Sequence, residues 1–138
     1  MPNNQPIFSK VGDIQWSGAS ASAANTTKDL TTGTTYSVFH ADVTSGGYVQ
    51  RIRFRPLGTN AATVARIWIN NGSSTGVAAN NVLFDEVSLS ATTISETSAN
   101  TLVELPLNFA LPPNYKIFVT LGVTASAGYA VSVIGGKY

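Results

Sequence analysis

Short runs of alternating apolar and polar residues, bounded by Gly, Asn, Pro and Ser, recur along almost the whole of this chain. The clearest are residues 48–56 (YVQRIRFRP) and residues 115–121 (YKIFVTL). A period of two places successive side chains on opposite faces of a β-strand. No connection between these runs has the period of an amphipathic helix, which argues against the βαβ units of a parallel sheet. The pattern predicts an all-β protein.

About eight strands are expected, separated by turns at short intervals. This spacing predicts a single-domain antiparallel β-sandwich that is jelly-roll-like. Residues 70–72 (NNG) predict a tight hairpin turn, because Asn and Gly tolerate positive φ. Residues 17–30 have few large apolar side chains and are expected to form a loop, or a strand that packs under another element. The expected strands are residues 13–16, 34–43, 48–56, 63–70, 82–89, 101–105, 115–121 and 129–134.

A chain of 138 residues is expected to fold as one domain, which at this size hides roughly 70% of its unfolded surface. Residues 1–12 contain Pro2 and Pro6, which disfavour helix, and we predict an extended N-terminal arm there and a sandwich domain over residues 13–138. The arm holds few core anchors, so we expect it to be disordered in the free protein. The chain contains no Cys and therefore has no disulfide, thiol nucleophile or thiolate metal ligand.

Only 11% of the residues are charged, against roughly a quarter in an average soluble domain. A surface with so little charge is expected to lie against other protein. The formal net charge of +1 is too small for charge-driven binding to nucleic acid. The polar N-terminus does not resemble a signal peptide, and no apolar run reaches the roughly 18 to 20 residues of a membrane span. We therefore expect no nucleic-acid or membrane partner, and synthesis in a cytoplasm.

Four arginines in two neighbouring runs are the strongest candidates for a binding surface. Arg51, Arg53 and Arg55 alternate along one strand and share one of its faces; the opposite face is expected to hold Tyr48, Gln50, Ile52 and Phe54. Arg66 and Trp68 on the next strand extend the patch if the two strands pair. Arginine suits protein interfaces, because its planar guanidinium pairs with carboxylates and stacks on aromatic rings. The predicted protein-docking patch is therefore Arg51, Arg53, Arg55, Arg66 and Trp68; the alternative is a solvated outer face of a sheet.

No catalytic, cofactor-binding or metal-ligating set stands out, and we predict that the protein is not an enzyme. His40 is the only histidine, and the chain has no G-x-S-x-G elbow to go with it and Asp42. Asp85 and Glu86 are neighbours on a strand, so they point to opposite faces and do not form a carboxylate pair. Trp16, Trp68 and the tyrosines are candidates for a sugar-binding face, but their alternation with apolar residues favours core packing.

Three segments carry a resemblance to a known family. They are residues 48–58 (YVQRIRFRPLG), residues 65–72 (ARIWINNG) and residues 105–122 (LPLNFALPPNYKIFVTLG). Over roughly residues 34–135, the chain resembles small virion proteins of tailed bacteriophages, most of all the head cement or decoration proteins with a jelly-roll sandwich. The features shared with that family are the strands, the Asn-Gly-type turn, and the segment LPPNYKI (residues 111–117), which leads into a late strand.

The resemblance implies a protein on the exterior of the virion capsid, which bridges neighbouring major capsid subunits against the pressure of packaged DNA. It also implies a homodimer or homotrimer over a symmetry axis of the shell. Two alternatives stay open. One is a host-recognition or carbohydrate-binding module on a phage tail or fibre, with Trp16 or Trp68 at a groove; the other is a tail or head-tail connector component.

Overall fold

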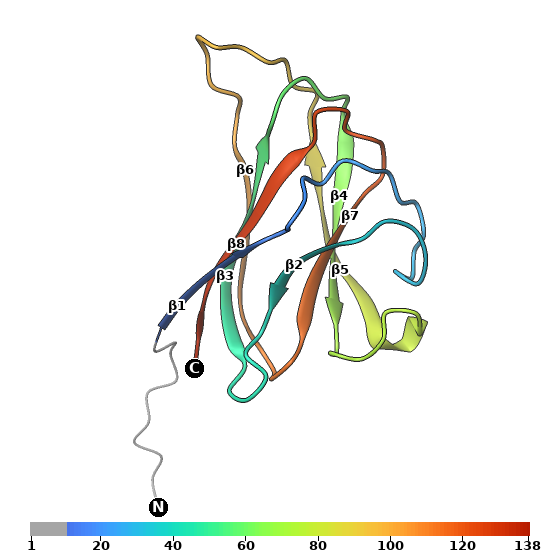
Figure 1. The fold of residues 1–138 in the computed structure, drawn as a ribbon, viewed down its shortest axis with the longest axis vertical. Helices are drawn as coiled ribbons and strands as arrows, with labels where there is room; N and C mark the ends of the chain where they lie inside the picture. Colours follow the sequence, from blue (N-terminus) through green and yellow to red (C-terminus); the bar gives the residue numbers. More distant parts are fainter. Residues whose placement is uncertain (1–10) are drawn as a thin grey trace, which may run out of the picture.

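Two four-stranded antiparallel sheets stack face to face in the computed structural model, which describes residues 11–138 (Figure 1). Each strand is between five and ten residues long. A short 3₁₀ turn, η1 (Ala78–Asn80), precedes the fifth strand. The strands are β1 (Val11–Trp16), β2 (Tyr36–His40), β3 (Gly47–Pro56), β4 (Thr63–Asn70), β5 (Asn81–Leu89), β6 (Val103–Leu111), β7 (Lys116–Leu121) and β8 (Tyr129–Lys137).

The strand order is that of a jelly roll. One sheet has the order β1-β8-β3-β6 and the other has the order β2-β7-β4-β5. Only β4 and β5 are neighbours both in the sequence and in a sheet, so most connections cross from one sheet to the other. The predicted all-β, eight-stranded, jelly-roll-like antiparallel sandwich is therefore confirmed.

The core lies between the sheets and is built from one face of each of the strands β2 to β8. Ile52, Phe54, Ile67, Val119 and Val133 are all fully buried in one cluster. Full burial of an aliphatic or aromatic side chain of this size stabilises a fold by roughly 1.5–3 kcal/mol. The alternating pattern of the sequence thus supplies the apolar face that each sheet presents to the other.

A β-bulge shifts the faces of β3 from the predicted alternation. Val49 is fully buried and Gln50 is exposed, although Gln50 was expected to share a face with Ile52 and Phe54. The pairing registers of β3 with β6 and β8 both shift between Val49 and Arg51. Because a bulge inserts one extra residue, the side chains before it change face and those after it do not. The prediction is therefore wrong for Tyr48 and Gln50 and correct for Ile52 and Phe54.

Both strands of the β1–β8 pair extend beyond their predicted limits, at the end of the pair where β1 begins and β8 ends. Val11 pairs with Lys137 and Gly12 with Gly136, so β1 begins two residues inside the predicted arm. The rest of that arm, residues 1–10, lies outside the described residues. The last strand runs to Lys137 because β1 and β3 both supply partners for its final residues.

The predicted tight hairpin turn at residues 70–72 is a longer connection. Asn70 pairs with Asn81, so residues 71–80 separate the two strands. The Asn70 side chain accepts a hydrogen bond from the Gly72 backbone N–H (2.8 Å) and donates one to the Asn81 side chain (2.8 Å). Gly72 has a φ of 89°, as the turn signal required, but the chain continues through η1 before β5 begins.

Buried asparagine side chains hold other connections in place. Asn60 is 2% exposed, and its Oδ1 accepts from the backbone N–H groups of Ala127 (2.9 Å) and Gly128 (3.0 Å). Asn25 is 4% exposed and donates to the carbonyl oxygens of Thr32 (2.9 Å) and Thr34 (3.0 Å). Buried loop backbone needs such partners. Neutral amides supply them here, in a chain with few charged residues.

The segment of residues 17–35, between β1 and β2, covers part of the second sheet. Its backbone bonds to Tyr129 at Ala21 and to Leu121 at Asn25, and the Tyr36 hydroxyl accepts from the N–H groups of Ser22 and Ala23. Leu30 within it is 1% exposed yet lies outside the main core cluster. This segment forms isolated bridges rather than a strand, which agrees with the prediction of a loop.

Candidate protein interface

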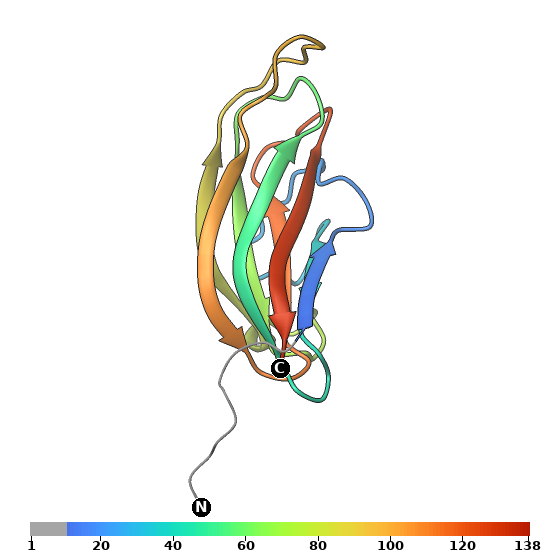
Figure 2. The ribbon, with the colours of Figure 1, turned by 90° about the vertical axis from the view of Figure 1, so that its left-hand side faces the viewer.

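The three arginines of β3 lie side by side on the outward face of the β1-β8-β3-β6 sheet. Val49, Ile52 and Phe54 face the core, so Arg51, Arg53 and Arg55 face away from it. Figure 2 views this sheet from outside, with β6, β3, β8 and β1 arranged across it. The predicted shared face of these three arginines is therefore present.

Apolar side chains from the edge of the same sheet continue this face. Ile14 pairs with Ile134, which pairs with Arg51, and Trp16 pairs with Ser132, which pairs with Arg53. Directly paired residues of antiparallel strands point to the same side of the sheet. Trp16 is 67% exposed and Ile14 is 60% exposed. We call the surface formed by Ile14, Trp16, Arg51, Arg53, Arg55, Glu104, Ser132 and Ile134 the arginine face.

A glutamate on β6 partly neutralises the arginines. Glu104 pairs with Arg53 across the strands, and its Oε1 lies 2.7 Å from Arg53 Nε and 3.6 Å from Arg51 Nε. Arg55 donates to the backbone oxygen of Asn100 at 2.9 Å and has no carboxylate partner among the described residues. Three arginines and one glutamate leave this group of side chains with a net positive charge. Beside Glu104, the whole side chain stays 40% exposed at Arg51 and 37% exposed at Arg53.

The structure separates Arg66 and Trp68 from the other predicted patch residues. The patch required β3 and β4 to pair, but β3 and β4 belong to different sheets. Ala65 and Ile67 of β4 face the core, so Arg66 and Trp68 face outward on the opposite side of the sandwich. Arg66 Nε lies 3.0 Å from Glu86 Oε1 on the neighbouring strand. The predicted five-residue patch is therefore not a single surface.

Trp68 is also inaccessible to a partner. Its side chain is 1% exposed, and its indole N–H donates to the Thr120 hydroxyl at 3.0 Å. Because Trp68 lies on the outward side of its sheet, this burial indicates that residues 17–35 cover it. The sequence favoured core packing for both tryptophans: Trp68 is buried, although outside the main core cluster, and the prediction is wrong for Trp16.

Sequence reasoning did not assign Ile14 and Trp16 to the interface. The available signal was the spacing of Ile14 and Trp16, which puts both side chains on one face of a short strand. An edge strand of a sandwich need not bury both faces, so this apolar face could be an exposed one. Gln15, between them, faces the other way, and its side chain bonds to both the backbone oxygen and the backbone N–H of His40. This link to β2 fixes which side of β1 turns outward.

A surface groove of about 310 Å³ adjoins the arginine face at Trp16. Its walls come from the start of the segment 17–35, from Leu57 and from the first half of β8. Exposed indole beside hydroxyl groups is the arrangement that stacks on sugars or buries against protein. The lining residues are Trp16, Ser17, Gly18, Ala19, Ser20, Leu57, Ala130, Val131 and Ser132.

The candidate catalytic groups have structural partners. His40 Nε2 lies 2.7 Å from Asn114 Oδ1, and Asp42 Oδ1 accepts from the backbone N–H groups of Ser45 and Thr44. These hydrogen bonds lower the pKa of Asp42 from its ordinary value, the largest contribution being the Ser45 N–H. Within residues 11–138, no group of three or more His, Asp or Glu side chains is arranged to hold a metal ion. Within the same range, no helix has the length and apolar character needed to cross a membrane.

Comparison with known proteins finds no relative of this chain. No protein-family model, no curated protein and no solved structure matches this chain significantly.

The two tryptophans are expected to respond differently to a quencher. In Trp16→Phe, the remaining Trp68 should emit at shorter wavelength and resist acrylamide, because it is buried and bonded to Thr120. In Trp68→Phe, the exposed Trp16 should emit at longer wavelength and be quenched efficiently. Equal quenching of the two variants would contradict the assigned exposures.

Proposed function

We propose that this chain is a structural virion protein that binds the outside of an assembled phage capsid and cements neighbouring major capsid subunits. The observation that carries the proposal is the arginine face, on which Trp16 and Ile14 lie exposed beside three arginines. Trp and Arg are the residues most enriched at the energetic centres of protein interfaces. The sequence resemblance to head cement proteins supplies the partner.

Cementing by such a protein follows from mass action. A ligand that binds the assembled shell but not its separate subunits stabilises the assembled state. Many copies, each binding across a subunit boundary, add their contributions over the whole shell. A dimer or trimer over a symmetry axis of the shell fits this role, because closed symmetry presents the same face to each equivalent subunit.

The test is binding to purified particles of the parent phage. We expect tight binding to expanded shells, little binding to isolated capsid subunits, and hundreds of copies per particle by cryo-electron microscopy and mass spectrometry. A handful of copies at one vertex or on the tail would overturn the cement assignment and favour a connector or host-recognition protein.

The groove at Trp16 favours one second candidate, a carbohydrate-binding module on a tail or fibre. An indole that is 67% exposed at the wall of a groove is a suitable stacking surface for a sugar ring. Quenching of Trp16 fluorescence by host cell-surface glycans, absent in Trp16→Phe, supports this candidate. An unchanged spectrum across a glycan panel contradicts it.

A further inference from the structure

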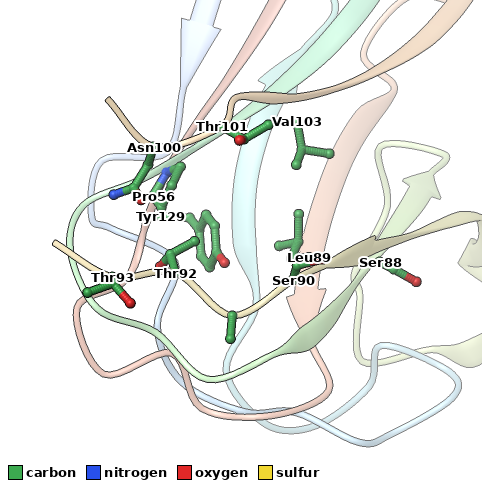
Figure 3. A pocket seen from close by; sticks show the side chains of 11 residues that line it. Pro56, Ser88, Leu89, Ser90, Thr92, Thr93, Asn100, Thr101, Val103 and Tyr129 are labelled. Carbon is green, nitrogen blue, oxygen red and sulfur yellow. The ribbon is translucent and has the colours of Figure 1, made fainter. Parts of the chain in front are cut away.

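A second cavity, of about 330 Å³, lies at the end of the sandwich where β5 ends and β6 begins. Figure 3 shows the Tyr129 ring between the stretch that carries Ser88 to Thr93 and the stretch that carries Asn100 to Val103. The volume is at the small end of the roughly 300–1,000 Å³ found for ligand sites. The lining residues are Pro56, Ser88, Leu89, Ser90, Ala91, Thr92, Thr93, Asn100, Thr101, Val103 and Tyr129.

Tyr129 lines this cavity, and its hydroxyl is a buried polar group without a hydrogen-bond partner among the described residues. The residue as a whole is 1% exposed. Burial also raises the pKa of Tyr129, so the hydroxyl stays a neutral donor. Its backbone is fixed by two hydrogen bonds with Ala21, each of 2.9 Å. Buried hydroxyls in folded proteins are nearly always paired, so this one lacks a partner that a bound group would supply.

The remaining lining is polar at the rim and apolar at the walls. The hydroxyls of Ser90, Thr93 and Thr101 are not used in hydrogen bonds to other residues in the range 11–138, whereas that of Thr92 donates to Gly58 O at 2.7 Å. Apolar surface comes from Pro56, Leu89 and Val103. The lining itself contains no carboxylate, amine, guanidinium or imidazole, and the Arg55 guanidinium reaches it only at the backbone oxygen of Asn100.

We propose that this cavity binds one neutral, polyhydroxylated ligand the size of a single hexose, with the Tyr129 hydroxyl bonded to a sugar hydroxyl. A pyranose has apolar C–H faces for Leu89 and Val103 and neutral hydroxyls for the Ser and Thr rim. The cavity shares no lining residue with the arginine face or with the Trp16 groove, so this proposal does not depend on the capsid-binding proposal.

The test is a titration of the free ¹⁵N-labelled protein with glucose, galactose and N-acetylglucosamine, followed by amide NMR. We expect at least one of these sugars to shift the amides of residues 88–93 and 100–103. Tyr129→Phe keeps the ring and removes only the hydroxyl, so it should weaken binding by roughly tenfold, the effect of one lost hydrogen bond. Its amide spectrum verifies that it is folded.

Two matched variants make the assignment specific. Thr101→Val, at the rim, should also weaken binding, and Trp16→Ala, at the other groove, should leave it unchanged. Absence of shifts at these residues with all three sugars, equal affinity in Tyr129→Phe, or a crystal structure of a sugar-soaked protein with only water on Tyr129 would overturn the proposal. Each of these results leaves the capsid-binding test untouched, because that test uses particles and the arginine face.

Discussion

Reversing two charges on the arginine face, with Arg51→Glu and Arg53→Glu, is expected to abolish binding to capsids while the protein stays folded. Each replacement changes the charge by two, so the formal net charge falls from +1 to −3. If both arginines are central to the interface, the loss exceeds about 3 kcal/mol, which is roughly a hundredfold in affinity. The unfolding free energy should fall only modestly: the lost ion pairs with Glu104 contribute about 0–1 kcal/mol, and the new carboxylate opposite Glu104 adds a repulsion of about 0.2–1 kcal/mol.

Two control variants separate docking from charge and from folding. Lys28→Glu with Lys116→Glu makes the same change in net charge at residues that lie off the arginine face, so it should leave capsid occupancy normal. Adding Glu104→Arg to the double arginine variant restores opposite charges across β3 and β6, and this triple variant should be folded and still unable to bind. Occupancy is measured by cosedimentation with expanded shells. Normal occupancy of the double arginine variant would remove the arginine face from the proposal.

Trp68→Ala is expected to lower the unfolding free energy by about 3–5 kcal/mol, the usual cost of deleting a large buried aromatic side chain. Trp68 is 1% exposed, and its loss also leaves the buried Thr120 hydroxyl without its 3.0 Å partner. The measurement is urea unfolding followed by circular dichroism, with the midpoint converted to a free energy. Such a loss is a large part of the 5–15 kcal/mol that stabilises a typical domain.

Trp16→Ala is the matched control, because it is the same substitution at an exposed site. It should change the unfolding free energy by no more than about 0.5 kcal/mol, as is usual for surface positions, and it should weaken capsid binding. Trp68→Ala is thus expected to have the larger effect on stability, and Trp16→Ala is expected to weaken capsid binding with little effect on stability. Similar unfolding midpoints for the two alanine variants would contradict the burial of Trp68 beneath residues 17–35.

Local sequence pattern predicted the number and approximate place of the strands, because a strand's alternation and its bounding turns lie within a few residues of each other. Its poorest match is β6, which was expected over residues 101–105 and spans Val103–Leu111. The fourth strand, Thr63–Asn70, has the predicted limits, and β3 and β5 differ from prediction by one residue at their starts. The larger differences arise where a distant partner decides. The register with β6 and β8 places the bulge in β3, and the pairing of β8 with β1 extends both strands to the pair Val11–Lys137.

The candidate site was only half predictable for the same reason. That Arg51, Arg53 and Arg55 share a face follows from a period of two within one strand. Whether Arg66 and Trp68 join them depends on the path of residues 57–62, which carry the chain from one sheet to the other and are held at Asn60 by Ala127 and Gly128. Neighbouring strands in a sequence often pair, and in this fold β3 and β4 do not.

By itself, the sequence determined the all-β class, the sandwich architecture and, outside the β3 bulge, which residues of a strand share a face, because these depend on alternation and on local turn residues. Only the tertiary structure decided which faces meet and which remain exposed. It paired β1 with β8, which brought Trp16 and Ile14 beside the arginines of β3, and it laid residues 17–35 over the sheet that carries Trp68. Both arrangements rest on contacts between segments far apart in the chain, which no local pattern specifies.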